Sequence, residues 1–231
     1  MILGLLVTFP ARVAFQWFMP TALTVSGIQG TVWAGNAGEA SVSGVYCQDI
    51  HWRMNPLRLF VGEVSYTVSA KPVRGFVESD VSLGFGGALS LSNLSAALPL
   101  DLIAGASGVQ DLQGNASLTF DRVTIVDGLA TAADGTLQVA NLIVPIISRD
   151  SLGGYKAEFF TQNNGIAASI EDTDGVVDLA GSFLLRADRT YEFTGMVIAK
   201  SETPQTLRQR LVNLPPMNST GQKEIRLEGV F

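Results

Sequence analysis

The stretch GVVDLAGSFLLRADRTYEFTGMV, residues 175–197, indicates the fold class more clearly than any other part of the sequence. Apolar side chains recur at most alternate positions of 175–185 and again of 191–197. This period of two is typical of β-strands, because successive side chains point to opposite faces of a sheet. The stretch therefore predicts two antiparallel strands with one covered and one wet face. The apolar face would hold Val177, Leu179, Phe183, Leu185, Tyr191, Phe193 and Val197.

The same alternation recurs on both sides of this stretch, at 48–56, 59–68, 80–85, 87–94 and 224–231. Dipeptides that supply positive φ angles occur between these segments, with Asp-Gly at 127–128, 134–135 and 174–175, Gly-Gly at 86–87 and Asn-Asn-Gly at 163–165. Such dipeptides favour tight hairpin turns. We predict a mainly β fold, an elongated, curved antiparallel sheet built as a meander of hairpins, in a single β-rich domain over 22–231.

Two segments depart from the strand pattern. Residues 98–105, LPLDLIAG, are compatible with a short helix or a crossover. Residues 203–216, TPQTLRQRLVNLPP, predict a short C-terminal helix, with Pro204 in its first turn and two prolines after its end. Its apolar stripe would consist of Leu207, Leu211 and Leu214.

The composition limits the partners and the compartments that are compatible with the chain. Charged residues make up 16% of the sequence, against about 25% in an average globular protein, so the chain covers much apolar surface or touches a membrane. The net charge of −6 means that the chain has no excess of basic residues to bind a phosphate backbone, which argues against nucleic acid as a partner. With Cys47 as the single cysteine, an intramolecular disulfide is excluded.

Residues 1–20, MILGLLVTFPARVAFQWFMP, contain one charged residue, Arg12. The uninterrupted run from Ile2 to Phe9 is shorter than the roughly 20 apolar residues that span a bilayer, and Pro10 follows it. We interpret this segment as the remnant of a membrane helix, with Met1 lying inside the anchor. The alternative is a buried N-terminal helix of a soluble protein.

Three features of the sequence are candidates for a binding or catalytic site. The glycine-rich stretch 27–44 lacks the Lys and Ser or Thr of a phosphate-binding loop, so its glycines are interpreted as turns and close approaches of the first hairpin, and no cofactor is expected. His51, the single histidine, would share a polar strand face with Asp49 and Arg53.

The acidic run at 171–175, EDTDG, resembles the start of a calcium loop but has Phe183 where the bidentate glutamate is needed. An acidic hairpin turn is the preferred interpretation, and no metal site or catalytic residue is predicted.

The order of motifs resembles the type II secretion system protein N family, also called general secretion pathway protein N. The matching segments are FPARVAF, VSGIQGTVWAGNAG, IHWRMNPLRLFVGEVSY, LSNLSAALPLDLI, LGGYKAEF and the stretch 175–197. The signature residues are, in the first motif, Gly30, Thr31, Val32, Trp33 and Gly35, and in the second, Trp52, Pro56, Leu57 and Gly62. They resemble sheet-forming and packing positions, with Trp33 as a packing residue.

The resemblance implies a single-pass inner-membrane protein of Gram-negative bacteria with its main domain in the periplasm. It would be an accessory, non-enzymatic component of the machinery that exports folded proteins across the outer membrane, binding other secretion proteins through strand edges and apolar patches. Two departures from the family pattern are the missing basic start and a looser C-terminal turn.

A second hypothesis is a periplasmic lipid-binding or lipid-transfer protein of the AsmA-like kind, whose apolar sheet face would hold acyl chains. The helix at 203–216 separates the two hypotheses: an open apolar groove beneath it favours lipid, and a face sealed by its leucines favours assembly. A hydrolase would need convergent polar groups and perturbed carboxylates, for which the sequence gives no specific sign.

Overall fold

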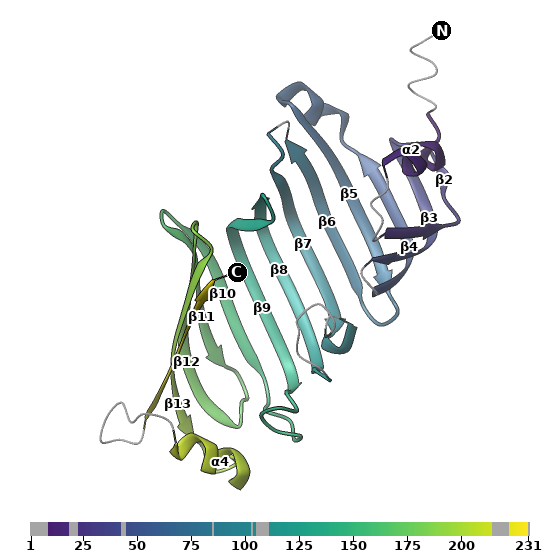
Figure 1. The fold of residues 1–231 in the computed structure, drawn as a ribbon. Coiled ribbons are helices and arrows are strands. Elements are labelled where there is room, and N and C mark those ends of the chain that lie inside the picture. Colours follow the sequence, from purple (N-terminus) through teal and green to yellow (C-terminus); the bar gives the residue numbers. More distant parts are fainter. Residues whose placement is uncertain are drawn as a thin grey trace. The chain divides into compact units, whose positions relative to one another are not determined.

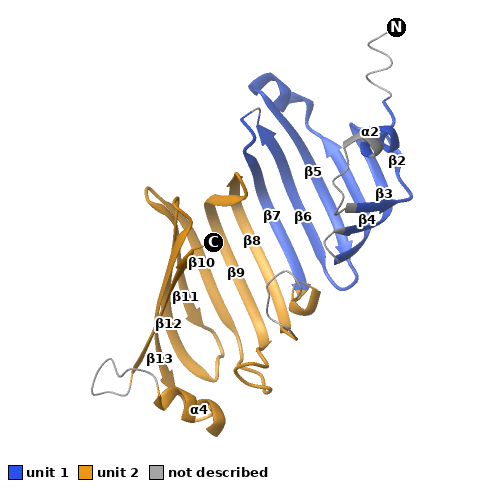
Figure 2. Ribbon diagram, in the orientation of Figure 1, with its two compact units in different colours: residues 1–98 blue, residues 99–231 orange. Residues whose placement is uncertain are grey.

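The structure is a computed structural model, and it describes residues 9–18, 23–42, 45–84, 86–102, 104, 111–213 and 222–230. The chain divides into two compact units, residues 1–98 and 99–231, coloured separately in Figure 2. Each unit is described by itself below.

The first unit is an antiparallel sheet in which the strands follow one another in chain order (Figure 1). Strand β2 lies outside this order: β3 pairs with β1 and β4, and the short β2 also pairs with β3. The elements are α2 (Ala11–Phe18), β1 (Leu23–Ser26), β2 (Gln29–Gly30), β3 (Ala34–Val42), β4 (Val45–Met54), the 3-10 helix η1 (Pro56–Val61), β5 (Glu63–Pro72), β6 (Phe76–Gly84) and β7 (Leu89–Pro99).

The second unit is also an antiparallel meander, with the order β8 to β14. Its elements are the 3-10 helix η2 (Leu100–Leu102), β8 (Gln113–Val126), β9 (Leu129–Ile143), β10 (Tyr155–Gln162), β11 (Gly165–Asp172), β12 (Val177–Arg186), β13 (Thr190–Ala199), α4 (Gln205–Val212) and β14 (Lys223–Val230). The predicted fold class is thus confirmed: the chain is mainly β and antiparallel, with few short helices.

The hairpin of β12 and β13 shows why the alternation at 175–197 was informative. Phe183 lies opposite Phe193 in the register, and both occupy the face that contains the buried Val177 and Val197. The intervening side chains of Asp178, Ala180 and Ser182 are exposed. The strands join where Arg189 has a φ of 70°, and the Thr190 amide donates to the Asp188 carboxylate over 3.0 Å.

The sheet of the first unit likewise has an apolar and a polar face. Register partners share a face, and Val64 lies opposite Leu83, as Tyr66 does opposite Val81. On the other face Thr67 lies opposite Asp80, and its hydroxyl donates to the Asp80 carboxylate over 2.5 Å. This is the two-faced arrangement that the sequence predicts.

Most of the predicted turns are present, and one is wrong. Asp127 and Gly128, with φ angles of 49° and 75°, join β8 to β9. The turns at 86–87 and 174–175 also lie between strands, and at 163–165 the two asparagines form the turn while Gly165 begins β11. Asp134-Gly135, in contrast, lies inside β9. A Cβ built on Gly135 would lie 2.4 Å from the Thr119 carbonyl oxygen and 2.5 Å from the Phe120 Cα atom. The glycine is therefore required for close approach of β8 and not for a turn.

The two segments that break the strand pattern form short helices. Within 98–105 the structure has η2, a single turn of 3-10 helix. The predicted C-terminal helix is present as α4, which Pro204 precedes. The predicted third stripe residue, Leu214, lies in the segment 214–221, which is outside the described residues.

Candidate functional site

The first signature forms the turn between β2 and β3. The Thr31 amide donates to the Ala34 carbonyl over 2.9 Å, and the Ala34 amide donates to the Thr31 hydroxyl over 3.3 Å. Gly30 has a φ of 89°, a conformation that side chains disfavour. The expected hairpin is present, because the described part of the stretch is strand, turn and strand.

The second signature contacts the first directly. Trp52 lies opposite Gly35 in the register of β3 and β4, and its indole N–H donates to the Thr31 carbonyl over 3.0 Å. Two residues after Trp52, the Met54 amide donates to the Trp33 carbonyl over 2.7 Å. Trp52 is buried, whereas Trp33 is half-buried. Motifs that are separate in the sequence therefore form one structural unit, with Trp52 as its main packing residue.

Helix α2 packs on this unit. Its residues Ala11 and Phe15 are four positions apart and so lie on one helix face. Ala11 is fully buried in a cluster with Ala37 and Trp52, and the rings of Phe15 and Trp52 have centroids 5.6 Å apart. The chain is also fixed just before the helix, because the Val32 amide donates to the Phe9 carbonyl over 3.1 Å.

The rest of the second signature builds η1, which joins β4 to β5. The Asn55 side chain accepts from the Leu57 amide over 3.1 Å and caps the turn. Pro56 occupies its first position, and Gly62 ends it in the left-handed conformation, at φ 79° and ψ 30°. Leu57, at 72% exposed, does not pack as the resemblance implied. The motif holds apolar side chains outward on a well-defined turn.

Two of the three polar residues predicted to share a strand face, His51 and Arg53, line a hollow of about 630 Å³ in the first unit. The predicted shared face of Asp49, His51 and Arg53 is interrupted, because the register shifts between Gln48 and His51 and Asp49 has a φ of 48°. Asp49 instead pairs with Lys71 at 3.2 Å. The polar lining of the hollow comprises Gln29, Asn36, His51, Arg53, Thr67 and Ser69. These groups can hydrogen-bond a polar ligand.

In the second unit, the acidic run at 171–175 forms the hairpin turn between β11 and β12, and other residues of the same unit bind it. The Asp172 carboxylate accepts from the Leu179 amide over 2.8 Å and forms an ion pair with Lys200. Lys200 also donates to the Gly175 carbonyl over 3.0 Å. Burial alone would raise the pKa of Asp172, but the bonds from Lys200 and Leu179 lower it below its ordinary value. Within the part of the chain that the structure describes, no three His, Cys, Asp or Glu side chains could hold a metal ion.

Tyr155 lies beside this turn. Its hydroxyl donates to the Leu152 carbonyl over 3.0 Å. Burial, together with the negative charges of Asp172 and Asp174, raises the pKa of Tyr155 to about 12. The side chain is therefore a neutral hydrogen-bond donor that holds the loop before β10 in place.

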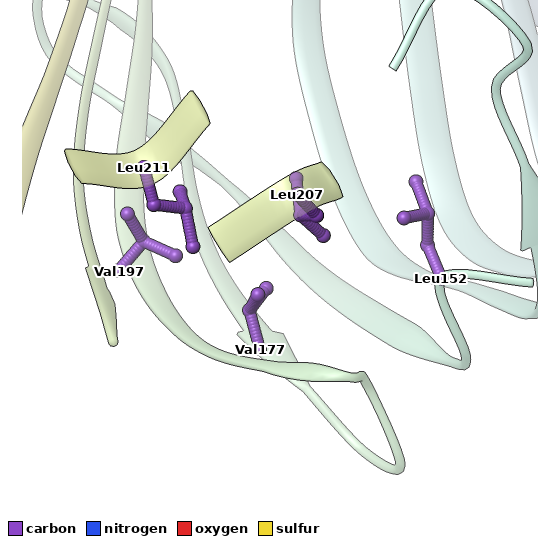
Figure 3. Packing of buried hydrophobic residues seen from close by; sticks show 5 residues of the cluster. All are labelled: Leu152, Val177, Val197, Leu207 and Leu211. Atoms are coloured by element: carbon purple, nitrogen blue, oxygen red, sulfur yellow. The ribbon is translucent and has the colours of Figure 1, made fainter. Parts of the chain in front are cut away.

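Helix α4 covers an apolar cluster in the second unit (Figure 3). Its buried residues Leu207 and Leu211 face Val177 of β12, Val197 of β13 and Leu152 of the preceding loop. A side-chain hydrogen bond also holds the helix in place. The Arg210 side chain donates to the Ile146 carbonyl over 2.7 Å. Two of the three leucines expected to seal this part of the sheet therefore do so.

The predicted membrane anchor, residues 1–20, lies partly outside the described residues. No helix among the residues that the structure describes is long and apolar enough to cross a membrane.

Comparison with known proteins gives one family. The family model "Type II secretion system (T2SS), protein N" matches residues 21–226. The type II secretion system protein N of Vibrio cholerae is 24% identical over 244 residues, covering 98% of this chain and 92% of that protein. No solved structure gives a significant match. Since the family model covers most of the chain, including both signature motifs and the α4 cluster, the chain belongs to the type II secretion system protein N family.

Proposed function

We propose that this component of the type II secretion system is an accessory, non-enzymatic protein of the inner membrane, with its β-rich part in the periplasm. It would act in the export of folded proteins across the outer membrane by binding other secretion proteins. Membership of the family supports the role in secretion. The signature residues support a non-enzymatic role, since they form turns and the surface on which α2 packs, and they do not bring reactive side chains together.

The observation that carries the proposal is the edge strand β14. This strand of 8 residues pairs with β13 along its whole length. It ends the strand order and has no second partner strand among the described residues. One row of its backbone N–H and C=O groups is therefore directed away from the sheet, where it can add a strand of another protein. Leu227, 56% exposed, offers apolar contact there.

Charged side chains on β14 would make such pairing selective. Arg226 pairs with Glu228 at 2.6 Å on its own strand and with Glu192 of β13 at 3.3 Å. Exposed pairs of this kind add little stability. They oppose pairing with an arbitrary strand, and they favour a partner of complementary charge.

The lipid-binding alternative requires an open apolar groove beneath the C-terminal helix. The α4 leucines instead pack onto Val177 and Val197 and cover that part of the sheet. This favours the assembly role over an acyl-chain groove at this position.

Photocrosslinking in cells that carry the secretion genes tests the proposal. A benzophenone amino acid replaces Leu227 in β14, and the control is Met196, an exposed residue of β13, which is paired on both sides. We expect position 227 to give adducts with identified secretion subunits that disappear when those genes are deleted. Recovery of phospholipid without protein at position 227 would contradict the assembly role.

A further inference from the structure

Four apolar side chains of η1 project from the sheet of the first unit. We propose that this apolar turn, consisting of Leu57, Leu59, Phe60 and Val61, inserts into the surface of a phospholipid bilayer. Phe60 is 88% exposed and Leu57 is 72% exposed. The inference adds a second membrane contact to the anchor, and it rests on the proposed function only for the location at a membrane.

The distribution of side chains around η1 selects the kind of partner. A 3-10 helix has three residues per turn, so Leu57 and Phe60 share one side, while Leu59 and Val61 lie on the two others. Each side of the turn therefore carries an exposed apolar side chain, and the side of Val61 also carries the charged Arg58. A groove in a folded protein covers one side of such a turn, whereas fluid acyl chains cover all of it. A turn with exposed apolar side chains on all sides and a single basic one is typical of a segment that lies in a membrane interface.

The backbone of the turn is suited to an apolar environment. Polar backbone groups in contact with lipid must be satisfied within the protein. The Leu57 amide donates to the Asn55 side chain over 3.1 Å. The Arg58 amide donates to the Asn55 carbonyl over 3.3 Å, and the Gly62 amide donates to the Leu59 carbonyl over 3.2 Å. The cap, the turn and the left-handed glycine thus satisfy these three amides within the protein.

The charged neighbours of the turn fit a membrane surface. Arg58 lies within η1, and its side chain pairs with Glu63 at 3.3 Å while remaining more than half exposed. A long basic side chain beside apolar ones can lie along the interface with its charge among the headgroups. Anionic headgroups attract such a residue.

The turn lies at the end of the sheet where the N-terminal segment joins the fold. The Met54 amide, at the end of β4, bonds to Trp33, and the adjacent Val32 bonds to Phe9. The sequence that precedes Phe9, MILGLLVT, carries no charged residue. Phe9, which follows this apolar sequence, and the apolar turn therefore lie at the same end of one sheet, which is the arrangement expected when that end faces a bilayer.

Fluorescence with the full chain tests the inference. Cys47→Ser removes the native thiol, and an NBD fluorophore is attached at Phe60→Cys. The matched control is Val73→Cys, because Val73 is also apolar, is 60% exposed and follows the opposite end of β5. The membranes are vesicles of phosphatidylethanolamine and phosphatidylglycerol, with and without a nitroxide on the acyl chain. We expect a blue shift and nitroxide quenching at position 60, and neither at position 73.

The outcomes separate this inference from the proposed function. If the protein binds vesicles but quenching at position 60 is no greater than at position 73, the turn does not insert into the membrane. The N-terminal anchor then remains the proposed membrane contact. Absence of binding to vesicles also overturns the inference, but it does not overturn the inner-membrane location, because residues 1–20 are interpreted as only the remnant of the anchor. Neither result changes the test of β14. As a second measurement, the double variant Leu57→Ser/Phe60→Ser should lower vesicle partitioning roughly tenfold or more, whereas Val73→Ser should leave it unchanged.

Discussion

Trp52 occupies the space that a side chain at residue 35 would need. A Cβ built on Gly35 would lie 2.5 Å from the Cζ2 atom of the Trp52 indole and 2.4 Å from the Gln29 carbonyl oxygen. The indole is held there by its hydrogen bond to Thr31 and by Phe15 of α2. The glycine of one signature and the tryptophan of the other are thus a single packing arrangement.

Gly35→Ala should destabilise the first unit because it inserts a methyl group where neither neighbour has space. We expect a loss of about 1–3 kcal/mol in the free energy of unfolding, the usual cost of overpacking. Gly86→Ala is the matched control, since a Cβ there meets no atom within 4 Å. Urea unfolding followed by tryptophan fluorescence measures both. Equal midpoints for the two variants would show that the Trp52 contact does not constrain residue 35.

Gly62→Ala should weaken the apolar turn through its backbone. At φ 79° a side chain encounters the following carbonyl, which costs roughly 1–2 kcal/mol for an ordinary residue. Gly62→Asn should cost less, because asparagine tolerates this conformation best among the residues with a side chain. Thermal unfolding of the two variants provides the measurement. If Asn proves no better than Ala, the penalty arises from space and not from φ.

Alternation of side chains was sufficient to predict β4 to β7 and β12 to β14, but not to show which apolar residues are covered. The faces of β12 and β13 follow the sequence directly because each position has one of two directions. Leu57 looked like a packing residue, yet it is exposed, because coverage depends on what the fold brings to it. Asp134-Gly135 looked like a turn. Its position within β9 depends on Thr161, whose amide donates to the Asp134 carboxylate over 2.8 Å from 27 residues away. Local sequence cannot show that partner.

Asp172→Asn should reduce the sensitivity of the second unit to acid. Bonds from Lys200 and Leu179 more than offset burial and lower the pKa of Asp172 in the folded state. A lowered pKa contributes stability above the unfolded value, near 4, which is lost as the pH falls through the folded value. The wild type should therefore lose more stability than the variant between neutral pH and acid. Urea midpoints of the wild type and the variant across this range measure the difference, and equal losses in the two proteins would show that the bonds to Asp172 do not set the acid dependence.

Leu211→Ala should destabilise the second unit far more than Val212→Ala does. The two residues are adjacent in α4, but Leu211 is 9% exposed in the cluster with Val177 and Val197, whereas Val212 is 67% exposed. Removing the buried leucine leaves a cavity and should cost about 2–3 kcal/mol. The exposed replacement should change the free energy of unfolding by less than about 0.5 kcal/mol. Urea unfolding of both variants checks the difference.

A second measurement on these variants bears on the lipid alternative. If α4 seals the apolar cluster, Leu211→Ala should increase the binding of an apolar dye such as ANS, because water and ligands gain access to Val177 and Val197. Val212→Ala should leave dye binding at the level of the wild type. If the wild type already binds as much dye as Leu211→Ala, with equal unfolding midpoints, then α4 does not seal the sheet. The cluster would then be open to acyl chains, and the argument that favours assembly over lipid binding at α4 would fail.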